Sequence, residues 1–353
     1  MEKITVLIVD DSRVIRDILS SLLEESERIE VVGVAENPYD AREKIKQLNP
    51  DVLTLDIEMP KMDGITFLKN LMRLRPMPVV MLSTLTQKGA DITLEALEIG
   101  AIDYIEKPKP TDIVKGADEF KAMLEDKIIQ ASSANVRKHL DQPLVNQALT
   151  PEQSSLKPIR YMSNHIIAIG ASTGGTEAIG KFLMTMPENC PPIVITQHIP
   201  VHFSQRFATR LNKLCKIKVK QAQDGALLVP GVAYIAPGGQ HLTFDLTHHK
   251  YTCVLEDSAK VNRHKPSVDV MFNSLLPIAS KIQAVLLTGM GSDGAEGMKL
   301  LKEAGSTTII QSKSSSLIWG MPGSAFRLDA HQHECHLADI PSLVLSNAQM
   351  TSI

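Results

Sequence analysis

Ile166-Ile-Ala-Ile-Gly-Ala-Ser172-Thr-Gly-Gly175 is the stretch that decides how the second half of this chain folds. Its apolar run predicts a buried β-strand, and Thr176–Met184 predicts a helix after a turn of small residues. A strand–turn–helix step of this kind is typical of a parallel α/β sheet, whose ligands bind at the carboxyl ends of the strands. We therefore expect Ser172 to be exposed beside the N–H groups of a helix N-terminus, where a nucleophile would be presented.

The composition of the whole chain indicates a soluble protein of two domains. It has 353 residues, a net charge of −3 and both signs of charge interspersed, so we expect no nucleic-acid partner. No apolar run approaches the ~20 residues that span a bilayer, and we expect no signal peptide before the first strand. The four cysteines show no paired spacing, which suits a reducing compartment. We expect a monomeric, cytoplasmic protein without direct membrane insertion.

Strand and helix patterns alternate through residues 1–130. Five such βα units predict a flavodoxin-like, doubly wound (βα)5 domain with a parallel sheet covered on both faces. The predicted strands are Thr5–Val9, Val31–Val34, Val52–Leu55, Val79–Leu82 and Asp103–Ile105. Residues 131–160 are rich in Ser, Gln, Asn and Pro, which predicts an interdomain linker.

Residues 161–353 predict a second, Rossmann-like doubly wound α/β domain. Strands are expected near Ile166, Ile193, Ile217, Val285 and Thr308. Three further short strands, Val232–Ala236, His241–Leu246 and Tyr251–Glu256, are separated by turns and predict an antiparallel β corner.

Carboxylates gather at the predicted strand ends of the first domain. Asp10 and Asp11 end the first strand and Asp56 ends the third, so these groups can converge at one edge of the sheet. Their mutual repulsion would be relieved by a hard cation such as Mg2+. Ser83 and Lys107 close the fourth and fifth strands, and their side chains could hold the oxygens of a phosphoryl group. A single strand-end aspartate is often only a solvated cap, but these five residues at successive strand ends together indicate a site.

These residues, with the Leu55–Gly64 segment and Lys107-Pro108, resemble a response-regulator receiver domain. The resemblance implies that Asp56 is phosphorylated, with a sensor histidine kinase as phosphodonor. It also implies Mg2+ bound by the residues Asp10, Asp11, Asp56 and the backbone carbonyl of Glu58. Ser83 would be the switch hydroxyl, with Thr84 as an alternative, Lys107 would contact the phosphate, and the aromatic Tyr104 would rearrange with Ser83.

Residues suited to acyl transfer end the strands of the second domain. His198 follows the apolar run Pro192–Thr196 and is the best candidate base for Ser172, and Asp293 in the Leu286–Gly294 segment could orient it. The backbone amides of Thr173 and Met290 are candidates for stabilising an oxyanion. A structural glycine-rich turn and a phosphate cradle remain alternatives. The order Ser, His, Asp differs from the Ser, Asp, His order of α/β-hydrolases, which disfavours that fold.

The motifs around these three residues, together with Tyr234–Gly239 and Lys265–Asp269, resemble the catalytic domain of chemotaxis protein-glutamate methylesterases, the CheB family. The resemblance implies a serine hydrolase that releases methanol from glutamate methyl esters on methyl-accepting chemoreceptors and deamidates receptor glutamines. It implies no cofactor for the esterase reaction. Phosphorylation of the receiver would then control the hydrolase.

Two further possibilities stay open at this point. The second domain could bind a partner or nucleotide without catalysis, although such a module does not require Ser, His and Asp together. The cluster His331-Gln-His333-Glu-Cys335-His336 contains metal-ligand types, but ligands one residue apart suit a tetrahedral site poorly. A late strand or surface loop is the expected role of that cluster.

Overall fold

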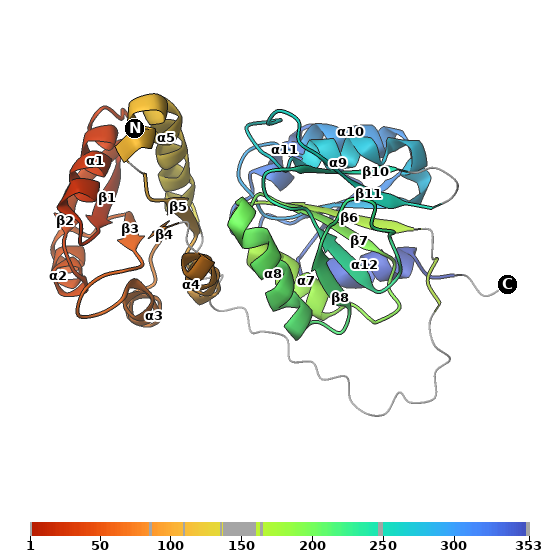
Figure 1. Cartoon of the computed structure of the whole chain (residues 1–353), viewed down its shortest axis with the longest axis horizontal. Helices are drawn as coiled ribbons and strands as arrows, with labels where there is room; N and C mark the ends of the chain where they lie inside the picture. Colours follow the sequence, from red (N-terminus) through yellow and green to blue (C-terminus); the bar gives the residue numbers. More distant parts are fainter. Residues whose placement is uncertain are drawn as a thin grey trace. The chain divides into compact units, whose positions relative to one another are not determined.

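The structure, a computed structural model of the chain, describes residues 2–84, 87–108, 110–134, 136, 160–162, 165–245 and 250–350. It divides into two compact units, residues 1–141 and 142–353. Each unit is built on its own parallel sheet (Figure 1). The helix Pro110–Ser132 reaches the start of the predicted linker 131–160, most of which lies outside the described residues.

The first unit contains a five-stranded parallel sheet in the order β2-β1-β3-β4-β5, which confirms the predicted (βα)5 fold. Its strands are β1 Ile4–Val9, β2 Ile29–Ala35, β3 Val52–Asp56, β4 Val79–Ser83 and β5 Asp103–Glu106. Its helices are α1 Arg13–Glu24, α2 Pro38–Leu48, α3 Gly64–Leu74, α4 Gln87–Ile99 and α5 Pro110–Ser132.

Local chemistry fixes where these helices begin. The Asn37 side chain accepts hydrogen bonds from the first backbone N–H groups of α2, where Pro38 occupies the first turn. Asp63 caps α3 by accepting from Thr66 N, and Gly64 follows because a Cβ there would meet the Asp56 carbonyl oxygen at 2.0 Å. Helices α1 and α5 cover one face of the sheet, and α2, α3 and α4 cover the other (Figure 1). The close approach of Gly64 to Asp56 places the start of α3 against the end of β3.

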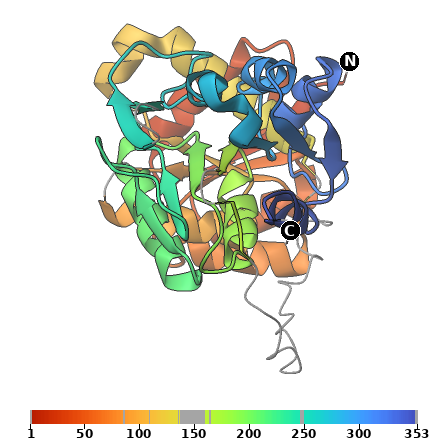
Figure 2. The ribbon, with the colours of Figure 1, turned by 90° about the vertical axis from the view of Figure 1, so that its right-hand side faces the viewer.

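The second unit contains a seven-stranded sheet in the order β14-β13-β12-β6-β7-β9-β8. Helices α9, α10 and α11 lie on one face and α7, α8 and α12 on the other, as the two views show (Figures 1 and 2). Its strands are β6 Ile166–Ala171, β7 Ile193–Gln197, β8 Lys218–Gln221, β9 Val232–Ile235, β12 Ile282–Leu286, β13 Thr307–Gln311 and β14 His333–Cys335. Its helices are α7 Gly175–Met184, α8 Val201–Leu214, α9 Val268–Ser274, α10 Ala295–Glu303, α11 Met321–Arg327 and α12 Ile340–Asn347.

Strand β6 marks the point where the winding of this sheet reverses. The chain continues from β6 toward β7 on one side, and β12 returns to the other side of β6. All residues of β6 are buried, as expected for the centre of a doubly wound sheet. Ligand sites of open α/β sheets lie at such a switch point, beyond the carboxyl ends of the strands.

The predicted antiparallel corner is partly wrong. The strands β10, His241–Asp245, and β11, Thr252–Glu256, do pair antiparallel in a separate two-stranded sheet. Strand β9, however, pairs parallel with both β7 and β8 inside the main sheet. Every residue of β9 is buried, because it lies between β7 and β8 in the sheet and its Val232 and Tyr234 belong to the same core cluster as Leu242, Phe244 and Cys253 of the β10–β11 hairpin.

Within the described residues, the longest apolar helix falls short of what crossing a membrane requires, so no membrane-spanning helix is found.

Candidate functional sites

The predicted carboxylates of the first unit meet at one edge of its sheet. Asp10 follows β1 and Asp56 ends β3, and both are buried. Asp11, which is exposed, completes a group in which one ligand oxygen from each of the three lies within 4.8 Å of the others. The Lys107 Nζ reaches them from the end of β5, 2.8 Å from Asp10 Oδ2 and 2.8 Å from Asp56 Oδ2. This oxygen-rich donor set fits a hard divalent cation.

Burial shapes the charges of this acidic site. It raises the pKa of Asp56 to about 6, with a further contribution from the negative charge of Asp10. Burial likewise raises the pKa of Asp10. For Lys107, burial acts to lower the pKa, but hydrogen bonds to Asp10 and Asp56 outweigh it and raise the pKa. The site therefore carries excess negative charge that a single lysine does not balance.

Three other predicted residues surround Asp56. The N–H of Glu58 donates to Asp56 Oδ1 at 3.2 Å, which places the Glu58 backbone beside the carboxylate. The buried Ser83 hydroxyl does not bond Asp56 but lies 2.7 Å from Thr93 Oγ1 on α4. Tyr104 on β5 is half-buried, with Lys127 Nζ 5.5 Å from its ring centre. Thr84 is half-buried, and its carbonyl oxygen accepts from Ser83 Oγ at 3.3 Å.

In the second unit, Ser172, His198 and Asp293 come together beyond three adjacent strands, β6, β7 and β12. Backbone bonds tie these loops to one another: Ser172 N donates to Thr288 O at 3.1 Å, and His198 N donates to Ala171 O at 3.2 Å. The turn after Ser172 is tight because Gly174 has a φ of +76°, and Gly175 N donates back to Ser172 O at 2.7 Å. The switch point thus holds all three predicted residues.

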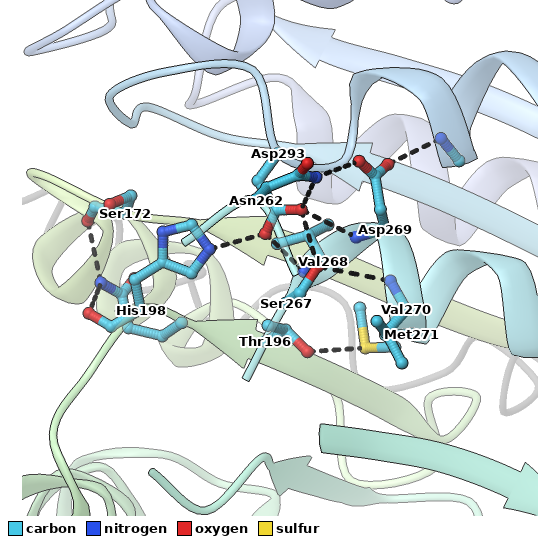
Figure 3. Close-up of polar contacts among 12 residues, drawn as sticks. Ser172, Thr196, His198, Asn262, Ser267, Val268, Asp269, Val270, Met271 and Asp293 are labelled. Carbon is cyan, nitrogen blue, oxygen red and sulfur yellow. Dashed lines mark hydrogen bonds and ion pairs between the residues drawn. The ribbon is translucent and has the colours of Figure 1, made fainter. Parts of the chain in front are cut away.

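The Asp293 carboxylate is almost fully buried and surrounded by donors (Figure 3). His198 Nε2 lies 2.8 Å from Asp293 Oδ2, which also accepts from Val268 N at 2.7 Å. Its Oδ1 accepts from Ser267 Oγ at 2.7 Å and Asn262 Nδ2 at 2.8 Å. Burial acts to raise the pKa of Asp293, but the bonds from His198, Asn262 and Val268 prevail and hold it well below its usual range. The carboxylate is therefore ionised.

The other nitrogen of the His198 ring faces away from Asp293. His198 Nδ1 is buried and has no hydrogen-bond partner, so Ser172 Oγ is not bonded to it in this conformation. Ser172 lies on the opposite side of the ring from Asp293 (Figure 3). The backbones of the two turns are joined by Gln197, whose Nε2 donates to Ser172 O at 2.9 Å and to His198 O at 3.3 Å. An unpaired buried acceptor beside a serine is what a general base requires.

The Gly289–Met290 peptide lies directly beside Ser172. A Cβ added at Gly289 would be 2.9 Å from both Ser172 Cβ and Ser172 N, so the approach requires glycine. The Gly289 carbonyl accepts from Gly320 N at 3.1 Å and Met321 N at 2.8 Å. Because a trans peptide directs its C=O and N–H oppositely, the Met290 N–H points away from these donors. Thr173 is buried, and its carbonyl accepts from Thr288 Oγ1 at 3.0 Å.

The sequence prediction missed several residues of this site. Asn262, His264 and Ser267 come from the irregular segment before α9, and Asp269 from its first turn. The ring of His264 stacks on His198, with centroids 3.6 Å apart and planes at 9°. The similarity of Lys265–Asp269 to a known family pattern was the one available signal, and it assigned no role to any of these residues.

The cluster from His331 to His336 is not assembled as a metal site. Its centre forms the short strand β14, as expected for a late strand near the surface. His331 instead stacks on Phe326, with ring centroids 5.1 Å apart. Among the residues that the structure describes, the only group of three or more His, Cys, Asp or Glu suited to a metal is that of Asp10, Asp11 and Asp56.

Fold and sites together define a response-regulator receiver joined to an α/β unit with a Ser–His–Asp site. Residues 6–118 match the response regulator receiver domain family, and residues 167–344 match the family described as CheB methylesterase. The chain belongs to the CheB methylesterase family.

Proteins of this family resemble the chain over almost its whole length. The protein-glutamate methylesterase/protein-glutamine glutaminase of Hydrogenovibrio crunogenus is 48% identical over 98% of this chain and 99% of its own. The protein of the same name from Methylobacillus flagellatus is 50% identical over 97% of this chain and 96% of its own. The crystal structure of the Thermotoga maritima CheB methylesterase catalytic domain matches 53% of this chain and 100% of its own, with a TM-score of 0.51 and 35% identity.

Proposed function

We propose that the chain is a phosphorylation-controlled serine hydrolase that releases methanol from glutamate methyl esters on chemoreceptors and deamidates receptor glutamines. The observation that carries the proposal is the buried, unpaired Nδ1 of His198 beside Ser172, on a ring whose Nε2 is bonded to the ionised Asp293. The names of the full-length relatives support the same activity. A binding module has no need for a serine, a base and a buried carboxylate in this order.

In the proposed acylation, His198 keeps its proton on Nε2, which donates a hydrogen bond to Asp293. Nδ1 therefore presents a lone pair. A rotation of the Ser172 side chain brings its hydroxyl to Nδ1. Nδ1 takes the proton as Oγ attacks the ester carbonyl, and Asp293 stabilises the resulting imidazolium. The N–H groups of Met290 and Thr173 are the candidate donors to the oxyanion. The bonds that the Gly289 carbonyl accepts strengthen the polarity of the Met290 N–H.

The tetrahedral intermediate then collapses to an acyl-enzyme, which is hydrolysed in the same site. The proton on Nδ1 passes to the leaving oxygen, methanol departs, and the glutamyl group remains esterified to Ser172. Water, deprotonated by Nδ1, attacks this ester. Nδ1 then returns the proton to Ser172 Oγ as the glutamate carboxylate is released, which restores both serine and base. With a glutamine substrate the leaving group is ammonia, and the later steps are unchanged. One site therefore serves both reactions, without a cofactor.

For the first unit we propose phosphorylation of Asp56 by a sensor histidine kinase. The residues Asp10, Asp11 and Asp56, with the carbonyl of Glu58, would hold Mg2+. When bound, the ion offsets the negative charge of the aspartates and of the phosphoryl oxygens. Lys107 Nζ already bonds Asp56 and would contact the phosphoryl group. Ser83 would leave Thr93 to bond a phosphoryl oxygen, with Tyr104 rearranging beside it.

The decisive experiment measures methanol release from methylated chemoreceptors with and without a small phosphodonor. Wild type is expected to accelerate with the phosphodonor, Asp56→Asn to retain only basal activity, and Ser172→Ala to show none. A serine-directed fluorophosphonate should label wild type and spare Ser172→Ala. Full activity of the serine variant, or equal labelling of both proteins, would instead favour a binding module.

A further inference from the structure

Two buried carboxylates face one amide group in the second unit. Asn262 Nδ2 lies 2.8 Å from Asp293 Oδ1 and 2.7 Å from Asp269 Oδ2, so its two hydrogens serve one carboxylate each (Figure 3). Asp293 and Asp269 are 2% and 7% exposed, which leaves little solvent to screen their repulsion. Asn262 is thus the neutral bridge between two negative charges.

The two carboxylates differ in how well they are stabilised. Asp293 receives bonds from His198 Nε2, Ser267 Oγ, Asn262 and two backbone N–H groups of α9. Asp269 Oδ1 accepts from Gly297 N at 2.7 Å. Burial, added to by the charge of Asp293, raises the pKa of Asp269 despite that bond and those from the Gly294 backbone and Asn262. A proton that enters this pair is therefore held by Asp269 while Asn262 is in place, and Asp293 stays ionised.

The turn that carries Asn262 is closed by its own backbone hydrogen bonds and contacts the site through His264. Val261 and His264 exchange reciprocal backbone hydrogen bonds of 3.0 and 2.8 Å. The two residues between them have φ values of 52° and 68°, and asparagine adopts this left-handed conformation more readily than most residues. At the end of the turn, His264 stacks on the base His198. The turn therefore directs the Asn262 amide toward the two carboxylates, although Asn262 as a whole residue is exposed.

We propose that Asn262 is a positioning residue for the hydrolase site: its amide bridges the two buried carboxylates and so keeps Asp293 ionised and directed at His198. This inference rests on the proposed function of Ser172, His198 and Asp293. Among the described residues, the titratable groups seen in contact with the carboxylate pair are His198 from the loop after β7 and each carboxylate itself. The other contacts are neutral: Ser267, Asn262 and backbone N–H groups from the starts of α9 and α10. His241 of β10 acts one step away, since its Nδ1 accepts from Ser267 N at 3.1 Å.

The test compares four full-length proteins: wild type, Asn262→Ala, Asp269→Asn and the double variant. Removing the amide leaves two facing carboxylates, so the pair takes up a proton at higher pH. Asn262→Ala is then expected to lower kcat at pH 6 roughly 10- to 100-fold, with KM little changed, as for a lost buried bond to a charged group. The acid limb of kcat/KM should move to higher pH. In the double variant one charge is gone, so most of kcat and the original acid limb should return.

Rescue is the outcome that a purely structural role cannot produce. Asp269→Asn alone places the new amide group opposite the amide of Asn262 and should be impaired. Its activity should return when Asn262 is also replaced by alanine. Arg263→Gln, at the exposed neighbouring position of the same turn, is the control for the turn itself. Full activity of Asn262→Ala, or a double variant no better than Asn262→Ala with an unmoved acid limb, would overturn the proposal.

A second readout separates this inference from the proposed function. The rate of fluorophosphonate labelling at Ser172, followed against pH in the same four proteins, depends on His198 and Asp293 but not on the receptor substrate. If wild type is labelled but releases no methanol, the substrate assignment fails, while the labelling rates still decide the role of Asn262. If Ser172→Ala is labelled as fast as wild type, the assumed nucleophile is wrong and the inference falls with it.

Discussion

The Nε2 atom of His198 lies 2.8 Å from Asp293 Oδ2, and the Nδ1 atom of the same ring is buried and unpaired. The contact fixes the tautomer of the neutral His198 ring with its proton on Nε2, because an ionised carboxylate can accept a hydrogen bond but cannot donate one. It therefore determines that Nδ1 is the nitrogen with a free lone pair, the one that would act as the proposed base. A buried acceptor without a partner is unfavourable in the resting protein, and a substrate-induced turn of Ser172 would relieve it.

Asp293→Asn should consequently act through the tautomer rather than through substrate binding. An asparagine can donate its amide hydrogen to Nε2, which leaves the ring proton on Nδ1 and blocks acceptance of the serine proton. We expect kcat for methanol release to fall roughly 10³- to 10⁴-fold, with KM little changed. Thermal unfolding checks that the variant is folded. A variant that keeps more than a tenth of wild-type kcat would show that Asp293 does not orient the base.

Gly289→Ala should reduce turnover by steric pressure on the nucleophile. The added methyl group would meet Ser172 Cβ at 2.9 Å and Met321 Sδ at 2.3 Å, so Ser172 or the Gly289–Met290 peptide must move. A displacement of about 1 Å at a reacting group can cost roughly 100-fold in rate. Gly180→Ala, within α7, is the matched control. A Cβ at Gly180 would make only an ordinary contact, 3.5 Å from Leu211 Cδ2. Equal kcat values for the two variants would contradict the close approach.

The sequence predicted those parts of the sites that depend on the ends of parallel strands. Ser172, His198 and Asp293 could be identified because each follows an apolar strand, and the ends of parallel strands share one edge. The same reasoning located Asp10, Asp56 and Lys107. It needed no knowledge of strand order, only of strand direction.

Residues outside that rule could not be predicted in the same way. Asn262 and His264 reach the site from a short turn with left-handed backbone, and nothing in local periodicity reports where such a turn points. Strand β9 was assigned to an antiparallel corner because it lies close in sequence to β10 and β11. Its continuous burial, from Val232 to Ile235, is the feature that distinguishes an interior parallel strand.

Thr93→Val should make the receiver easier to activate. The Ser83 hydroxyl is 2.7 Å from Thr93 Oγ1, which in turn donates to Gly89 O at 2.7 Å, so α4 provides a bonding partner for the proposed switch hydroxyl in the resting receiver. Valine keeps the shape of threonine but removes that partner. The loss of one neutral hydrogen bond in the resting state should lower the phosphodonor concentration for half-maximal activation roughly 2- to 10-fold.

Two further variants test that interpretation of the contact between Ser83 and Thr93. Thr93→Ser retains a hydroxyl and should behave as wild type, whereas Ser83→Ala should respond weakly whatever residue occupies position 93. The measurement is methanol release at increasing concentrations of a small phosphodonor. An unchanged half-maximal concentration in Thr93→Val would mean that the contact does not restrain Ser83.

Asp56→Asn should stabilise the receiver at neutral pH. The pKa of Asp56 is raised to about 6, first by burial and then by the charge of Asp10, whereas an unfolded aspartate titrates near ~3.9. Between these two values the folded protein binds more protons than the unfolded chain, so the free energy of unfolding falls as pH rises and is constant above the folded pKa. Asparagine carries no charge and escapes this loss. The variant should exceed wild type by ~1–3 kcal/mol at pH 7.5, and the gain should shrink toward pH 4.

Urea unfolding of both full-length proteins at pH 4.5 and pH 7.5 measures this difference, without added divalent cation. The receiver transition is the one that Mg2+ moves to higher urea in wild type, because a ligand that binds only the folded state stabilises it. Loss of one ion-pair partner for Lys107 opposes the gain, but Lys107 keeps Asp10 at 2.8 Å. If Asp56→Asn were less stable than wild type by the same amount at both pH values, the lysine contact would outweigh the buried charge. Asp56 would then be stabilised, not strained, in the resting receiver.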